Sequence, residues 1–156
     1  MSEVLTIRLH AQQCEFRIGE SSYVVPVGSA TLTRTIGGDP PRPEDLTNAI
    51  GLVVDHLEDV TRELPTVASA GRVEISGRGV TTVADVEVGA AATTPFLLSR
   101  HAAEDVFRTV ATETAAQRAH NPGLPADLVH DVVGVAAAVV AVFRGLGLDE
   151  LWVVQQ

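Results

Sequence analysis

Alternation of apolar and polar residues predicts β-strands near the start of the chain. The pattern has a period of two over Val4–Leu9 and over Cys14–Ile18, as expected for strands that bury one face. Residues 23–33 are rich in Val and Thr and are predicted to form a third strand that bends at 26–28. Two further short strands are expected at 72–75 and 151–154.

Apolar residues recur every three or four positions between 46 and 64, which predicts an amphipathic helix over 43–64. Pro43 suits a first helical turn, the acidic residues after it complement the helix dipole, and Pro65 ends the helix. Ser99 is predicted to cap a helix over 100–120, and a buried helix is expected over 126–145. The apolar run at 132–143 is too short to span a bilayer.

The predicted order of elements is three strands, a helix, a strand, two helices and a strand. Short turns between the first three strands indicate an antiparallel meander, whereas the later strands need helical crossovers. This order is typical of a ribonuclease H-like α/β domain, in which helices pack on a mixed sheet. At 156 residues, we expect one domain covering 1–156.

The first hairpin turn, HAQQ at residues 10–13, does not fit the common turn chemistry. Two-residue hairpin turns favour Gly, Asn-Gly or Asp-Gly, because their central residues adopt positive φ. No glycine lies between Leu9 and Ile18. Local propensity alone does not explain this turn.

Charge and cysteine content narrow the classes of partner. The formal net charge of −9 argues against nucleic acids and anionic membranes, because both require clustered cationic residues. All the cationic side chains except histidine are arginines, which is typical of a GC-rich bacterial genome. Cys14 is the only cysteine, which suits a reducing cytoplasm, and the start of the chain does not have the pattern of a signal peptide.

Four segments, taken together and in order, resemble the exopolyphosphatase/guanosine pentaphosphate phosphatase (Ppx/GppA) family. No one of them is specific, but their order extends over nearly the whole chain. The segments are CEFRIG (14–19), VPVGSATLTRTIGGDPPRPEDL (25–46), SGRGVTTVADVEV (76–88) and QRAHNPGLPADLVHDVVGVAAAVVAVFRGLGLDELWVV (117–154).

The resemblance implies a ribonuclease H-like lobe of the actin-like ATPase superfamily. Members of the family have two such lobes and hold phosphate in the cleft between them. The resemblance here covers the second lobe only. The first lobe, which supplies one phosphate loop and the catalytic Glu of the family, has no counterpart in these residues.

By the same register, the phosphate turn of the family is degenerate in this chain. The family pattern is Asp-x-Gly-Gly-Gly-Ser-Thr-Glu, and its glycines let backbone N–H groups close on a phosphate. Arg8 takes the place of the Asp, and only Glu15 matches. The remaining replacements are His10, Ala11 and Gln12 for the glycines, Gln13 for Ser, Cys14 for Thr, Thr31 for an Arg, Arg34 for a Glu, and Arg78-Gly79 for Gly-Thr.

The loop SGRGVTT at 76–82 keeps features that bind anions elsewhere, namely glycines, a cation and hydroxyls before a helix. Its candidate residues are Gly77, Arg78, Gly79, Thr81 and Thr82. The alternative is an ordinary strand-to-helix turn in which Thr81 or Thr82 caps the helix. The histidines lack metal-ligand spacing and no acid has a visible partner base, so we expect no catalytic residue, metal or cofactor.

These features favour a non-catalytic, single-lobe relative of the phosphatases that acts as an interaction or regulatory module. We expect it to form a homodimer or to bind a protein partner. Two alternatives remain open. One is a sensor for phosphate or a nucleotide, and the other is a phosphohydrolase lobe that a partner completes in trans.

Overall fold

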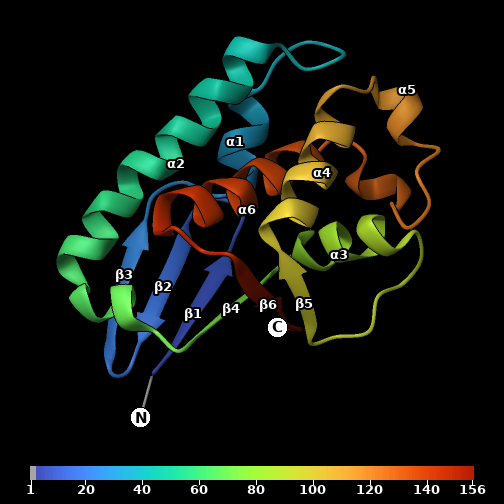
Figure 1. Ribbon diagram of the computed structural model, residues 1–156. Coiled ribbons are helices and arrows are strands. Elements are labelled where there is room, and N and C mark those ends of the chain that lie inside the picture. The colour runs from blue at the N-terminus through green and yellow to red at the C-terminus, as the bar shows by residue number, and fades with distance from the viewer. Residues whose placement is uncertain (1–2) are drawn as a thin grey trace.

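The sheet begins with an antiparallel meander of β1 (Val4–Leu9), β2 (Cys14–Ile18) and β3 (Ser21–Val25) in the computed structural model, which describes residues 3–156. Strand β1 pairs in parallel with β4 (Arg72–Gly77), and β4 pairs in parallel with β6 (Glu150–Val153). An edge strand, β5 (Phe96–Ser99), runs antiparallel to β6. The resulting six-stranded mixed sheet has the order β3-β2-β1-β4-β6-β5 (Figure 1).

The helices cover one face of this sheet. They are α1 (Ser29–Thr35), α2 (Pro43–Glu63), α3 (Val80–Val88), α4 (Arg100–Ala111), α5 (Ala115–Arg118) and α6 (Val132–Leu146), with short 3-10 turns η1 (Pro65–Ser69) and η2 (Ala126–Leu128). Helix α6 packs against α1, α2, α3 and α4 (Figure 1). The predicted ribonuclease H-like architecture, a mixed sheet with helices packed on it, is therefore confirmed.

Among residues 3–156, no helix packs on the other face of the sheet. Along β1, Leu5, Ile7 and Leu9 point into the core and are buried, whereas Val4 and Arg8 point away from it and are exposed. Strand β2 alternates in the same way. We call the second set of side chains the open face.

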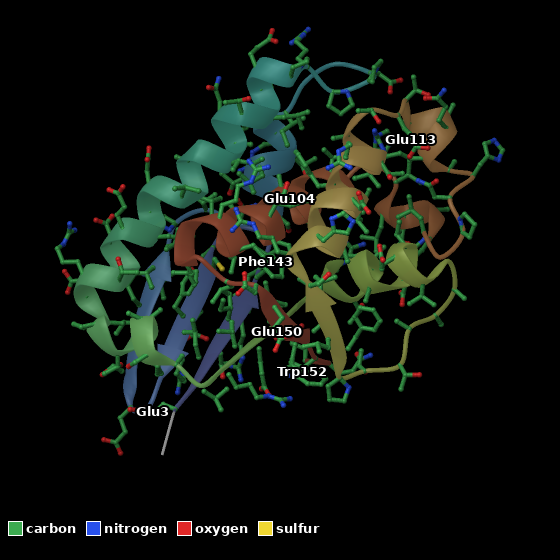
Figure 2. All side chains as sticks on the ribbon, in the orientation of Figure 1. Glu3, Glu104, Glu113, Phe143, Glu150 and Trp152 are labelled. Atoms are coloured by element: carbon green, nitrogen blue, oxygen red, sulfur yellow. The ribbon has the colours of Figure 1, made fainter. Side chains whose placement is uncertain are left out.

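Helix α6 runs through the centre of the core. Every residue from Val132 to Phe143 is buried, which explains a sequence that is apolar on all sides. Small residues let its neighbours approach closely: the Cα of Gly134 lies so near α1 that a Cβ there would stand 2.9 Å from the carbonyl oxygen of Ser29. Across the helix layer, Arg144 of α6 donates to both carboxylate oxygens of Glu104 on α4, at 2.9 and 2.7 Å (Figure 2).

The third predicted strand, 23–33, is wrong over its second half. The strand ends at Val25, and 29–35 form α1. Pro26 has no N–H to donate to a sheet, and the hydroxyls of Thr33 and Thr35 donate to the carbonyls of Ser29 and Thr31, four residues back. Threonines that favour a strand by composition thus satisfy their hydroxyls within a helix.

The two later helices also differ from expectation. The helix predicted over 100–120 ends at Ala111, and Thr114 caps the separate α5, with Gln117 completing the capping box. The helix predicted over 126–145 starts only at Val132, after η2. Strand β5 was not predicted, because its apolar positions are few and follow Pro95 directly. Ser99 does cap α4, and its hydroxyl accepts from the N–H of Ala102 at 3.1 Å.

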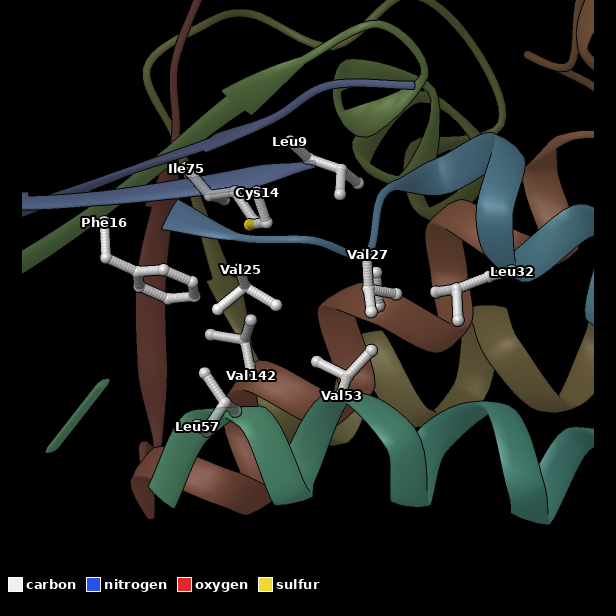
Figure 3. Close-up of a pocket in the computed structure, with 11 residues that line it drawn as sticks. Leu9, Cys14, Phe16, Val25, Val27, Leu32, Val53, Leu57, Ile75 and Val142 are labelled. Atoms are coloured by element: carbon white, nitrogen blue, oxygen red, sulfur yellow. The ribbon is translucent and has the colours of Figure 1, made fainter. Parts of the chain in front are cut away.

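A small cavity of about 10 Å³ lies in the core between the sheet, α2 and α6 (Figure 3). Its volume is about that of one water probe, and its walls are apolar side chains such as Phe16, Leu57 and Val142. The cavity is therefore a packing defect rather than a binding site. Burial in its wall raises the pKa of the Cys14 thiol to about 12, with a smaller contribution from the charge of Glu15. Separately, no helix within residues 3–156 has the length and hydropathy needed to cross a lipid bilayer.

Two glycine-to-alanine changes test this packing with opposite expected signs. Gly51→Ala in α2 should raise the free energy of unfolding by about 0.5–1 kcal/mol, because no atom lies within 4 Å of the new Cβ and alanine favours helix. Gly134→Ala should lower it by about 1–3 kcal/mol, because the Cβ would overlap the backbone of α1. Urea unfolding followed by circular dichroism measures both. Equal effects of the two changes would contradict the close α1–α6 approach.

Candidate functional site

The residues singled out in the sequence meet at one edge of the sheet. Strands β1 and β4 run in parallel with Leu9 opposite Gly77, so the turn at 10–13 and the loop at 76–82 both leave the sheet at its carboxyl edge. In α/β proteins ligands commonly bind at this edge, where parallel strands end. The start of α6 lies beside the loop, with Val135 3.0 Å from the position of a Cβ on Gly79.

The HAQQ turn forms without glycine because it is longer than a two-residue turn. Leu9 and Cys14 are the last paired residues, so all four residues from His10 to Gln13 make the connection. The N–H of His10 donates to the carbonyl of Gln13 at 2.9 Å. No non-glycine residue within the described range 3–156 has positive φ. The longer loop therefore removes the conformational requirement that glycine usually meets.

Carbonyl groups of the HAQQ turn accept hydrogen bonds from the first N–H groups of α1. The N–H groups of Ser29 and Ala30 donate to the carbonyls of His10 and Ala11, at 3.0 and 2.8 Å. The first N–H groups of a helix have no partner within the helix, and in other proteins such groups bind phosphate. Here the chain's own backbone takes that place.

Gly28 makes this contact possible. A Cβ at this position would stand 2.3 Å from the carbonyl oxygen of His10 and 2.5 Å from that of Ala11. Its N–H donates to the hydroxyl of Thr31 at 3.2 Å. The glycine therefore allows backbone to pack on backbone, and the space that it frees holds protein atoms.

Side chains around the turn also pair with one another. Arg34 donates to the side-chain oxygen of Gln12 at 3.0 Å. Glu15, the one residue that matches the phosphate turn of the family, lies on the open face 3.8 Å from Arg8 and 3.7 Å from Arg17. Its carboxylate is thus engaged by two cations on the sheet.

In loop 76–82 the glycines permit a close backbone approach and positive φ angles, and the arginine forms ion pairs. Gly77 has φ +141°, and a Cβ there would lie 2.2 Å from the carbonyl oxygen of Leu9. Arg78 is exposed and lies 3.2 Å from Asp127 and 3.5 Å from Asp131, so two carboxylates face its charge. These carboxylates come from the start of the α6 region and were not anticipated from the sequence.

The capping role predicted for Thr81 or Thr82 is wrong. Gly79, in the left-handed conformation, is the N-cap of α3, and both threonines lie inside its first turn. Thr82 is buried and Thr81 half-buried. Gly79 provides the turn because its φ of +88° is strained for any residue with a side chain. The five candidate residues therefore lie in a strand-to-helix turn whose backbone geometry is set by Gly77 and Gly79.

The described residues hold no group of three or more His, Cys, Asp or Glu side chains that could bind a metal ion. His10 is half-buried in the HAQQ turn, where its backbone makes the contacts that position α1. No arrangement of a nucleophile with a base is found among the candidates of this edge.

Comparison with solved structures identifies the fold. An exopolyphosphatase-like protein superposes with a TM-score of 0.89 at 19% identity, over 99% of this chain and 55% of that one. The Ppx/GppA phosphatase of Aquifex aeolicus matches with a TM-score of 0.86 at 16% identity, over 99% and 53% of the two chains. An exopolyphosphatase from Cytophaga hutchinsonii ATCC 33406 matches with a TM-score of 0.73 at 15% identity, over 99% and 53%.

The fold is that of one half of a Ppx/GppA phosphatase. The chain spans about half the length of the structures that it matches, which agrees with the single lobe inferred from the motifs. No family model matches the sequence. No curated protein matches it either. The scaffold of the Ppx/GppA lobe is therefore retained at a sequence identity below one fifth.

A pair of variants tests whether loop 76–82 serves geometry rather than binding. Gly77→Ala should lower the free energy of unfolding by about 2–5 kcal/mol, because it adds backbone strain and a clash with Leu9. Arg78→Ala should change it by less than about 1 kcal/mol, because its ion pairs are exposed to solvent. Thermal and urea unfolding give both values. A tolerated alanine at position 77 would contradict this interpretation of the loop.

Proposed function

We propose that this chain is a non-catalytic Ppx/GppA-like lobe that acts as an interaction or regulatory module and self-associates. The observation that carries the proposal is the contact between the HAQQ carbonyls and the first N–H groups of α1. A phosphate at this edge would need free N–H donors and space. Here backbone carbonyls accept from those N–H groups and occupy the space beside them. The ion pairs of Arg78 and of Glu15 support the same conclusion.

An activity assay tests the non-catalytic part of the proposal. The purified chain, incubated with polyphosphate and Mg²⁺, should release no phosphate above the blank, while a two-lobe Ppx/GppA phosphatase in parallel should release it. Phosphate release that Glu15→Gln abolishes would overturn the proposal, because Glu15 is the retained acid of the family turn. Release that appears only after adding a first-lobe protein would instead support a lobe completed in trans.

The open face is the surface that we assign to self-association. It carries three of the four large apolar side chains that are most exposed, Val4, Val24 and Leu97, at 41, 45 and 44% exposure. Trp152 lies between them on β6, with the guanidinium of Arg72 4.5 Å from its ring centroid. Figure 2 shows Trp152 and Glu150 together on β6, at the end of the molecule opposite to Glu113. Val24 and Leu97 lie on the two edge strands and Val4 on β1, so apolar side chains are distributed over the whole of this helix-free face, which is the surface that we assign to a second copy.

Charge favours a second copy of the chain as the occupant. The strand register places three arginines and three glutamates on this face, namely Arg8, Arg17, Arg72, Glu15, Glu74 and Glu150. The face is therefore balanced, whereas the chain as a whole carries −9. Two copies related by a two-fold axis would therefore meet here with less repulsion than through the acidic remainder of the surface. Two such sheets would stack about 10 Å apart.

Sedimentation or light scattering should give twice the mass of one chain at micromolar concentration. Leu97→Glu should convert the dimer to monomer, because it places an unpaired charge in the interface. The matched control is Val88→Glu, since Val88 is 52% exposed on α3, away from the open face, and should leave the dimer intact. A monomeric wild-type chain, or equal effects of the two variants, would refute self-association through this face.

A further inference from the structure

A buried cation faces a second pocket, which lies beside α1 and the start of α6. This pocket has a volume of about 160 Å³ and lies between α1, the loop at 37–41, α5 and the first turn of α6. Its lining includes Thr33, Ile36, Arg118, His130, Val133 and Gly134. Arg118 is only 4% exposed, which is unusual for an arginine.

Three of the five N–H donors of Arg118 bind backbone carbonyls. Its Nε donates to Val129 at 2.8 Å, and its Nη1 donates to Val110 at 3.1 Å and to Glu113 at 2.7 Å. Nη2 has no hydrogen bond to the rest of the described chain. Within that range, however, no fully buried side-chain nitrogen or oxygen lacks a partner. Nη2 is therefore not sealed in protein, and the pocket is the space that it faces.

The charge of Arg118 has no close counter-ion within residues 3–156. Burial lowers the pKa of its guanidinium, and the nearby charges of Asp39 and Glu113 offset part of that effect. Neither carboxylate forms an ion pair with Arg118: Asp39 accepts from the N–H of Ala115 at 2.7 Å, and Glu113 accepts from the side chain of Asn121 at 2.7 Å. A buried guanidinium without an ion pair is costly unless something else supplies negative charge.

The start of α6 adds to the positive potential. Val133 and Gly134, in the first turn of this 15-residue helix, line the pocket. Asp131, the N-cap residue, makes no side-chain hydrogen bond to the helix, and its carboxylate is instead drawn to Arg78 at 3.5 Å. The helix dipole therefore meets the pocket without a capping carboxylate. His130 stands at the mouth as an exposed imidazole.

We propose that this pocket binds a compact oxyanion, with Nη2 of Arg118 and the first turn of α6 as its donors. The volume exceeds that of several water molecules but is well below the 300 Å³ or more that drug-sized ligands usually occupy. An ion of the size of inorganic phosphate or sulfate fits, and a nucleoside does not. This site goes beyond the proposed function, since it needs neither catalysis nor a dimer.

Titration of the ¹⁵N-labelled chain with inorganic phosphate tests the site. We expect saturable shifts of the amide signals of Val133, Gly134 and Gly38, similar shifts with sulfate, and none with chloride at the same ionic strength. Shifts that do not saturate, or that follow the exposed Arg8, Arg34 and Arg78 instead, would overturn the proposal. These readouts do not depend on the oligomeric state or on activity, so they separate this inference from the proposed function.

A matched pair of variants adds a test that does not disturb the core. His130→Glu should weaken phosphate binding about three- to tenfold, because it places a negative charge at the mouth. His101→Glu makes the same change at an exposed position on α4 and should leave the affinity unaltered. Arg118→Met should abolish binding if the variant folds. If it does not fold, the histidine pair decides, and equal effects of those two variants would refute the site.

Discussion

The close packing of α6 against its neighbours is the constraint on which the rest of the fold depends. Its buried residues are mostly alanine, valine and glycine, which let α1, α2, α3 and α4 all pack closely against it. Gly134 brings α1 to within backbone contact of α6. The position of α1 in turn brings its first N–H groups under the carbonyls of the HAQQ turn. The small residues of α6 thus help to place α1, whose N–H groups contact the turn at the sheet edge.

Local patterns predict the elements whose formation is decided by nearby residues. Both strands of the first hairpin are predicted at their observed bounds, because one face of each is buried and apolar residues partly alternate with polar ones. The bounds of α2 followed from its apolar stripe and from the prolines at both ends. By contrast, α1 is rich in threonine, so its composition predicts a strand. Its first N–H groups donate to carbonyls of a turn nearly twenty residues away, and no local pattern reveals that contact.

The candidate site shows the same division between local and distant causes. The absence of glycine from the turn at 10–13 is visible in the sequence, but the contact of its carbonyls with the first N–H groups of α1 becomes evident only once α1 is placed. The ion pairs of Arg78 join residues about fifty positions apart in a loop and at a helix start, and no spacing rule predicts such pairs. Arg118 follows a capping box in a polar segment, so its sequence context suggests an exposed side chain, although three carbonyls bury it.

Retention of the lobe scaffold alongside a closed edge shows which parts of this fold tolerate change. The sheet, α2 and α6 make one continuous core, to which residues 10–13 of the HAQQ turn do not belong. The turn at this edge forms hydrogen bonds with the backbone of α1, so its carbonyls find partners within the chain.

The stacking of Arg72 on Trp152 has a practical consequence for observing the molecule. The sequence contains one tryptophan, so its fluorescence, when the indole is selectively excited, arises from a single ring on the open face. The ring is half-buried within strand β6 and in contact with a cation. Any layer that covers the face would shift its emission to shorter wavelengths, and exposure to water would shift it to longer ones. The protein thus carries its own optical probe at the surface where its sheet is bare.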